Sequence, residues 1–284
     1  MLRILIPTDF SKNAMTAMRT GLLLAKSFGA EVVFMHAMSK PMVPATSPEE
    51  VYTSLFESDR RELHEKLRSS CQKLYEEIAL RPSEVQKQVL VMTAPIPETI
   101  LQVIASQSID LVVMGAGGLN SMKNLLFGSN TLQLMDLTPV PLLVVPQAHA
   151  FKGFRQIFTI VRNKDLNYRD GLRLLARITR NFGATVTFLV VQKAHEPLPH
   201  LSDIIGADGL TEEFRALSHE IKAVQKNELA PTYIHQPQAD LFAWLPRKRG
   251  FWSDSYTEDL MEEVLSEHQL PILVIPPEGH KINT

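Results

Sequence analysis

Apolar positions in the first part of the chain follow two different periods. The apolar runs Arg3–Pro7 and Glu31–Ala37 are short and continuous, as expected of buried strands. Between them, apolar residues recur at helical spacing and predict one buried helical face: Met15, Met18, Leu22, Ala25 and Phe28. Ser11 is placed to cap the start of this helix, and Gly29 suits the cap at its end.

The same alternation continues to the middle of the chain. It predicts helices over Ser47–Leu80, Pro97–Ser106 and Asn130–Leu137, and strands over Val85–Met92, Leu111–Met114 and Leu142–Val145. Alternating strands and helices are typical of a doubly wound parallel sheet with helices on both faces. Because Leu111–Met114 and Leu142–Val145 are apolar throughout, both are expected to be central strands buried on two sides.

The second half of the chain repeats this pattern. It predicts a strand over Gln156–Asn163, a helix over Asn167–Asn181 and a strand over Thr185–Val191, and Phe182-Gly-Ala184 matches Phe28-Gly-Ala30. Farther on, Asp240 and the run Pro271–Pro276 match Asp110 and the run Pro141–Pro146. The second copy is trimmed: a helix over Thr211–Leu229 and a strand over Thr232–His235 leave little room for a third helix in Gln236–Ala239.

We therefore expect an α/β protein with two doubly wound, five-stranded parallel-sheet domains. The domains span residues 1–147 and 154–284, and the joint lies in Gln147–Gly153. The last strand of each copy is an apolar sheet edge, and such edges invite pairing. The two last strands can pair within one chain, and a further homodimer is a separate expectation.

Composition excludes several classes of protein. A net charge of -2 gives no bulk attraction to nucleic acid or to an anionic membrane. No apolar stretch is long enough to span a bilayer, and the apolar run at the N-terminus is too short for a signal peptide. Cys71 is the only cysteine and is expected to be a small core residue. A cytoplasmic location is the expectation.

One glycine pattern carries candidate chemistry: Gly115-x-x-Gly118, nine residues, then Gly128-Ser129. Gly115 ends a strand at the carboxyl edge of the sheet, where open α/β folds bind ligands. Gly118 leaves room for a phosphate, and Gly128-Ser129 opens a helix whose free N–H groups suit an anion. The pattern matches neither the Walker loop nor the dinucleotide fingerprint. On spacing alone, a tight turn explains it equally well.

Three segments together resemble the universal stress protein family: Ile4-Leu-Ile-Pro-Thr-Asp-Phe-Ser11, Val113-Met-Gly-Ala-Gly-Gly118 and Phe127-Gly-Ser129. Nucleotide-binding members of that family carry Gly-x2-Gly-x9-Gly-Ser/Thr, which this sequence matches in full. The two copies resemble its tandem members. The resemblance implies an adenine nucleotide α-hydrolase-like fold, pairing of last strands about a two-fold axis as an intrachain pseudo-dimer, and bound ATP, with or without Mg²⁺.

The resemblance also implies which residues bind the nucleotide. Pro7, Thr8 and Asp9 would lie beside the adenosine, and Ala37 would contact adenine. The ribose and phosphates would be held by Met114, Gly115, Gly118, Gly128, Ser129 and Asn130. Asp9 is also a common residue at a helix entry, so we expect it to have both roles. The segment Lys40–Pro48 is either a flap over the nucleotide or an ordinary surface loop.

The second copy lacks the corresponding cradle. Asn163 stands opposite Asp9, and Leu245, Lys248, Glu258 and Asp259 stand opposite Gly115, Gly118, Gly128 and Ser129. We therefore expect one nucleotide site, in the N-terminal domain of a stress-response regulatory protein. No catalytic triad, carboxylate pair or metal motif stands out, so at most slow ATP hydrolysis is expected. An ATP-utilising enzyme of related fold and an oligomeric scaffold without nucleotide are the alternatives.

Overall fold

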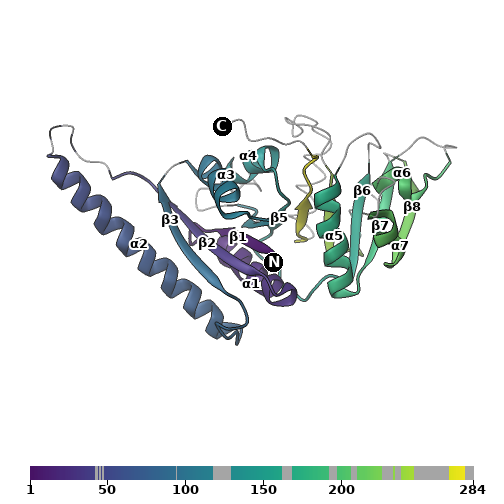
Figure 1. Ribbon diagram of the computed structural model, residues 1–284, viewed down its shortest axis with the longest axis horizontal. Coiled ribbons are helices and arrows are strands. Elements are labelled where there is room, and N and C mark those ends of the chain that lie inside the picture. The colour runs from purple at the N-terminus through teal and green to yellow at the C-terminus, as the bar shows by residue number, and fades with distance from the viewer. Residues whose placement is uncertain are drawn as a thin grey trace.

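A computed structural model gives the architecture of the chain. The residues that it describes are 1–41, 44, 46, 48–93, 95–117, 129–161, 168–191, 197–205, 210–225, 233, 238–245 and 269–278. The described part forms an elongated molecule around one continuous sheet (Figure 1). The long helix α2 lies at one end of the long axis and strand β8 at the other.

The sheet contains the ten strands of the described residues, in the order β3-β2-β1-β4-β5-β10-β9-β6-β7-β8. The first half of the chain supplies β1 (Arg3–Pro7), β2 (Glu31–Met38), β3 (Lys87–Thr93), β4 (Leu111–Gly115) and β5 (Leu142–Val145). The second half supplies β6 (Gln156–Val161), β7 (Thr185–Val191), β8 (His219–Val224), β9 (Leu241–Trp244) and β10 (Ile272–Val274). The predicted α/β fold with two five-stranded parallel sheets is confirmed, and the two sheets join through β5 and β10 into one mostly parallel sheet.

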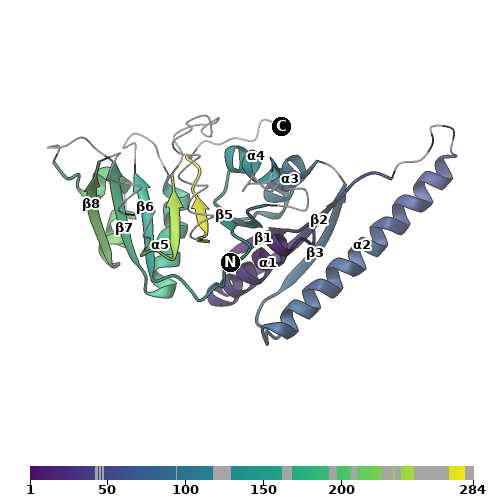
Figure 2. The ribbon, with the colours of Figure 1, turned by 180° about the vertical axis from the view of Figure 1, so that it is seen from behind.

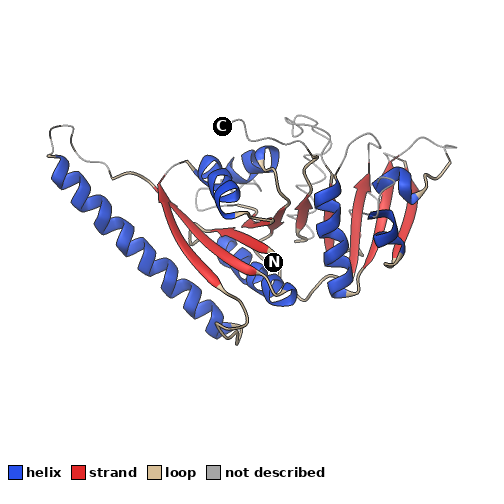
Figure 3. Ribbon diagram, viewed as in Figure 1, coloured by secondary structure: helices blue, strands red, loops and turns tan. Residues whose placement is uncertain are grey.

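Helices cover both faces of the sheet (Figure 3). In order along the chain they are α1 (Lys12–Phe28), α2 (Glu49–Glu77), α3 (Ile96–Gln107), α4 (Ser129–Leu137), α5 (Arg169–Phe182), α6 (Leu201–Ile205) and α7 (Leu210–Arg215). One core unites α1, α2 and α5 to α7 with one face, and another unites α3 and α4 with the opposite face. Every residue of β4 and β5 is buried, as predicted for central strands.

Local sequence signals explain the first helix. The Ser11 side chain accepts a hydrogen bond from the Ala14 amide, 3.1 Å away, and so satisfies one of the free N–H groups at the start of α1. At the other end, Gly29 adopts a left-handed conformation (φ 61°), which a residue without a Cβ takes at little cost. Both caps are those that the sequence predicts.

The two halves meet at β5 and β10, which pair antiparallel with Leu143 opposite Leu273. All other strand pairs are parallel, and each half has the same internal strand order when read outward from this junction. The two predicted last strands are therefore interior in the complete sheet, whose outer strands are β3 and β8. Since the sheet is continuous, the boundaries at residues 147 and 154 stay predictions.

An aromatic cluster packs across the same junction. The Phe28 and Phe182 rings, at the ends of α1 and α5, meet edge to face with their centroids 6.0 Å apart. Phe151 and Phe154, from the joint between the halves, pack on Phe182 at 5.8 and 5.5 Å. The residues that mark the repeat in the sequence, Phe28 and Phe182, therefore touch each other in the fold.

The predicted helix over Thr211–Leu229 is wrong. Helix α7 ends at Arg215, and strand β8 follows at His219–Val224 and pairs with β7. As an outer strand, β8 has one neighbour and keeps polar residues on its exposed side, where Lys222 and Glu220 form an ion pair at 2.7 Å. A partly polar outer strand carries no continuous apolar run, so its pattern of polar and apolar residues resembles that of an exposed helix. Of the predicted strand Thr232–His235, only Tyr233 lies among the described residues.

Cys71 lies in the C-terminal half of α2 and is fully buried, as predicted. Burial raises the pKa of its thiol to about 12, although Lys87 acts in the opposite direction. The thiol is therefore protonated at neutral pH and is an unreactive core group. Among the described helices, none combines the length and the apolar character needed to cross a membrane.

Candidate functional site

Hydrogen bonds to β2 and within the turn itself hold the segment that follows β1. The Thr8 amide donates to the Met35 carbonyl of β2 at 2.8 Å, and the Thr8 hydroxyl accepts from the Phe10 amide at 3.1 Å. Asp9 Oδ1 accepts from the Ser11 amide at 2.9 Å, just before α1 begins. Pro7 and Thr8 are buried and Asp9 is half-buried. The helix-entry role of Asp9 is therefore observed, whereas its nucleotide role stays a prediction.

Side chains from β2 and α2 pack against this turn and against Phe10, which directly follows it. His36 Nδ1 lies 2.8 Å from the Thr8 carbonyl oxygen, and the His36 and Phe10 rings pack with centroids 4.6 Å apart. Lys66 of α2 places its ammonium 4.4 Å from the Phe10 ring centroid, within range of a cation–π interaction. Phe10 has a φ of 63°, a conformation that a bulky residue rarely adopts. His36 is thus a packed, half-buried residue of the strand that neighbours β1.

The end of β4 lies beside this turn because β4 pairs with β1, with Val112 opposite Leu5. Gly115 closes β4 and packs against the start of α1 so tightly that a Cβ there would lie 2.8 Å from the Asn13 carbonyl carbon. Real Cβ atoms do not approach backbone so closely, so any larger residue must displace α1 or β4. Gly115 is therefore required for helix packing, a reason that the ligand-based interpretation of the motif missed.

Asn13 is a residue of this edge that the sequence reasoning missed. Its side-chain amide donates to the Gly117 carbonyl at 2.9 Å, and so ties the first turn of α1 to the glycine segment. Its Oδ1 is buried and accepts no hydrogen bond within the described part of the chain. An asparagine in the first turn of a helix looks like an ordinary surface residue in a sequence, and no spacing signal distinguishes it.

Helix α4 reaches the same edge from the other face of the sheet. The Thr131 hydroxyl, in a side chain that is almost fully buried, donates to the Gly115 carbonyl at 3.2 Å. Ser129, the first residue of α4, is exposed, and Asn130 is half-buried. The N–H groups of this first helical turn are the ones that a bound anion would meet.

The predicted site residues have different outcomes. Pro7, Thr8, Asp9 and Gly115 come together at the carboxyl ends of the adjacent strands β1 and β4. Ala37 lies on the next strand, β2, half-buried and paired with Met92. The Met114 side chain is buried in the core against α3 and α4, so only its backbone is available to a ligand.

Several predicted positions lie outside the described residues. They are Gly118 and Gly128 in the first half, and Asn163, Lys248, Glu258 and Asp259 in the second half. Leu245, which replaces the first glycine in the second half, is buried. It follows β9 at the edge that corresponds to the end of β4.

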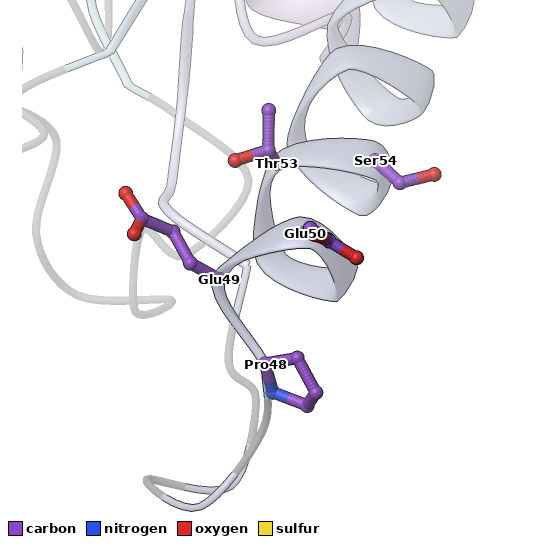
Figure 4. A pocket seen from close by; sticks show the side chains of 5 residues that line it. All are labelled: Pro48, Glu49, Glu50, Thr53 and Ser54. Carbon is purple, nitrogen blue, oxygen red and sulfur yellow. The ribbon is translucent and has the colours of Figure 1, made fainter.

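One hollow of about 660 Å³ lies elsewhere, at the start of α2. It is lined by Pro48, Glu49, Glu50, Thr53 and Ser54. The side chains do not converge on one point: Glu49 and Ser54 point to opposite sides of the helix start (Figure 4). Two carboxylates would also repel a phosphate, so this hollow is unsuited to a nucleotide. The described residues contain no group of three or more His, Cys, Asp or Glu side chains placed to hold a metal.

Comparisons with known proteins agree with this architecture. The model of the universal stress protein family matches residues 1–146. Universal stress protein MJ0577 of Methanocaldococcus jannaschii is 24% identical over 160 residues, which cover 52% of this chain and 96% of that protein.

Two solved structures match nearly the whole chain. A universal stress protein from Archaeoglobus fulgidus superimposes with a TM-score of 0.66 at 15% identity, covering 98% of this chain and 97% of that one. A functionally unknown protein from Pseudomonas aeruginosa superimposes with a TM-score of 0.55 at 14% identity, covering 98% and 93%. These likenesses show a shared fold over both halves. Because the family model spans just over half of the 284 residues, the chain belongs to the universal stress protein family.

Proposed function

We propose that the protein is an ATP-binding regulator of the stress-response type, with one nucleotide site in its N-terminal half. The observation that carries the proposal is the meeting of three segments at one edge of the sheet. These are the Pro7–Asp9 turn, the Gly115–Gly117 segment and the start of α4 at Ser129. This edge is the topological switch point of the first half, because the connection after β1 leads to β2 on one side and the connection after β4 leads to β5 on the other side. Open α/β folds bind ligands at such points.

The residues at this edge fit a nucleotide in one orientation. The carboxylate of Asp9 can accept hydrogen bonds from adenine or ribose, whereas it would repel a phosphate. The N–H groups and the Ser129 hydroxyl at the start of α4 can donate to phosphate oxygens, aided by the helix dipole. The adenosine would therefore lie over the β1 turn and Ala37, and the phosphates would lie toward α4. Bound ATP, with or without Mg²⁺, would supply the negatively charged phosphates. The residues of this chain would bind and orient the nucleotide.

The chemistry of the site favours binding over turnover. Efficient phosphoryl transfer needs a positioned group to orient the attacking water or hydroxyl, together with charge stabilisation. Asp9 is engaged at the helix entry, and Lys66 is engaged with the Phe10 ring. We therefore propose that nucleotide occupancy, rather than its hydrolysis, alters the protein's shape or its affinity for a partner in the cytoplasm.

Titration calorimetry with ATP, with and without Mg²⁺, tests the proposal. Gly118→Glu should abolish binding, because the carboxylate adds bulk and repels the phosphates. Ser69→Glu is the matched control, since it adds the same charge at an exposed position of α2. Loss of binding in Gly118→Glu alone supports the assignment, and equal binding by both variants would place the nucleotide elsewhere. Sustained phosphate release over many turnovers would favour an ATP-utilising enzyme.

A further inference from the structure

The residue that follows the Pro7–Asp9 turn has an unusual backbone conformation. Phe10 has a φ of 63°, in the left-handed region, where the Cβ of any residue but glycine crowds the following carbonyl oxygen. Such strain persists only where the surrounding structure holds it, and it is common at sites that bind ligands or switch. The contacts of Phe10 therefore decide whether the turn before it keeps its shape.

Two different elements supply side chains that contact the Phe10 ring. His36 of β2 packs on it with the ring centroids 4.6 Å apart, and its Nδ1 lies 2.8 Å from the Thr8 carbonyl oxygen. The second contact comes from α2, where the Lys66 ammonium lies 4.4 Å from the Phe10 ring centroid. His36 belongs to a strand that pairs with β1, whereas Lys66 belongs to a helix. The Lys66 contact thus links α2 to the turn.

The charge of Lys66 is directed to the ring rather than to a carboxylate. The ion pairs of α2 in the described part of the chain use other residues of the helix, Arg60 and Glu77 among its members, and leave Lys66 to the Phe10 ring. A cation–π contact at an exposed position favours its formed state by about two- to fivefold. That is enough to shift a turn whose own backbone strain opposes it.

Lys66 also occupies a distinctive place along α2. This helix runs beside β3 at one end of the molecule, as both views show (Figures 1 and 2). Its buried residues begin at Leu67, directly after Lys66, and end at Tyr75. The contact with Phe10 therefore lies where the part of α2 that packs on the sheet begins.

We propose that Lys66 is a positioning residue for the nucleotide site, that it acts through the Phe10 ring, and that α2 is thereby coupled to nucleotide occupancy. The inference rests on the proposed function, because the Pro7–Asp9 turn is the part of that site that meets the adenosine. Coupling between two sites is reciprocal. A nucleotide bound to the turn therefore favours the Lys66 contact by the same factor by which that contact favours the nucleotide.

Titration calorimetry with adenosine and with ATP tests the positioning role. Lys66→Met keeps an apolar stem and removes the charge, and should weaken both ligands by the same factor, up to about fivefold. Lys73→Met is the matched control, since it removes the same charge from an exposed position about two turns along α2, and should bind both ligands as the wild-type protein does. Weakening of ATP alone would mean that Lys66 acts directly on the phosphates, and would overturn the proposal.

A double-mutant cycle shows whether Lys66 acts through the ring. Glycine adopts a φ of 63° at little cost, so Phe10→Gly removes the ring and retains the turn. Adding Lys66→Met to Phe10→Gly should leave the adenosine affinity unchanged, although the same substitution weakens it in the wild-type background. An equal loss in both backgrounds, or wild-type affinity in Lys66→Met alone, would contradict the coupling.

Hydrogen exchange without any ligand separates this inference from the proposed function. The Phe10 and Ser11 amides donate to side chains of the turn itself, so their exchange rates report whether the turn is held. Lys66→Met should speed exchange at both amides, up to about fivefold, and Lys73→Met should not. If the wild-type protein binds no ATP, the proposed function fails, while the exchange rates still decide whether Lys66 holds the turn. If exchange in Lys66→Met is unchanged, the positioning role fails even where ATP binds.

Discussion

At the scale of single residues, Asn13 is the contact that connects the two ends of the candidate site. It belongs to α1, which begins directly after the Pro7–Asp9 turn, and its amide holds the Gly117 carbonyl. Asn13 also packs against Gly115, where no Cβ can be accommodated. It therefore positions the glycine segment relative to the turn, and we expect it to influence how phosphates are bound rather than how adenosine is bound.

Replacing Asn13 with alanine should weaken ATP binding without weakening adenosine binding. A hydrogen bond of this kind contributes about 1 kcal/mol net, which corresponds to roughly a fivefold change in affinity. Calorimetry with both ligands measures the ratio of the two affinities. Thr16→Ala, which removes a hydrogen bond from α1 to the Gln147 carbonyl, is the control and should leave that ratio unchanged. Equal weakening of ATP and adenosine would show that Asn13 is merely structural.

Gly115 illustrates how far a motif can be interpreted from sequence. Its position at the end of a strand follows from the apolar run before it, and the structure confirms that position. The reason for its missing side chain does not follow, because the Asn13 backbone that occupies the space lies about a hundred positions earlier in the chain. Contacts between residues so far apart depend on the packing of α1 on β4, which hydrophobic spacing alone does not reveal.

At the scale of secondary-structure elements, the ends of α1 and α5 hold the two halves together. Phe28 and Phe182 occupy matching places before the left-handed glycines Gly29 and Gly183, and their rings touch. The Arg177 guanidinium carbon lies 5.6 Å from the Phe28 ring centroid, within range of a cation–π contact from α5. This aromatic contact reinforces the β5–β10 pairing on one face of the sheet.

Phe182→Ala should lower the free energy of unfolding by on the order of 2 kcal/mol, less than for a fully buried phenylalanine because Phe182 is half-buried. The cost arises from lost contacts with Phe28, Phe151 and Phe154. Chemical denaturation measures this loss of stability. Phe56→Ala, in the N-terminal half of α2 and outside its buried residues, is the control. A change below about 0.5 kcal/mol would show that the cluster does not stabilise the junction.

Most elements could be predicted from the sequence, and the failures have a common cause. β1 and β7 have the predicted bounds, and α1 has its predicted caps, because buried runs and capping residues are local signals. β8 was missed because an outer strand with one neighbour needs few apolar residues. The exposure of half of α2 could not be foreseen either, since the apolar stripe containing Tyr52 and Phe56 looks like a core-facing stripe.

At the scale of the whole molecule, the joint between the halves contains a partly buried histidine, His149, whose neutral form is favoured in the folded protein. Burial lowers the pKa of His149 below its usual 6.5, although a hydrogen bond involving the Gln269 backbone and the charge of Asp240 act in the opposite direction. The unfolded chain therefore takes up a proton at this position more readily than the folded chain does. Its contribution to stability is complete above pH 6.5 and is lost as the pH falls below that value.

His149→Leu should accordingly reduce the loss of stability on acidification. Thermal unfolding of the wild-type protein and the variant across the range from neutral pH to about pH 5 measures the difference, since the two proteins share all their other histidines. His64→Leu on α2 is a control for the removal of a histidine as such. A parallel decline of all three proteins with falling pH would contradict the role of His149.

The central claim is that a continuous sheet built from two similar halves carries one adenine-nucleotide site, in the half that keeps the glycine motif. The stoichiometry of ATP binding to the full-length chain, measured by titration calorimetry at protein concentrations above the dissociation constant, tests it most directly. The account predicts one ATP per chain. Two ATP per chain, or none, would contradict it.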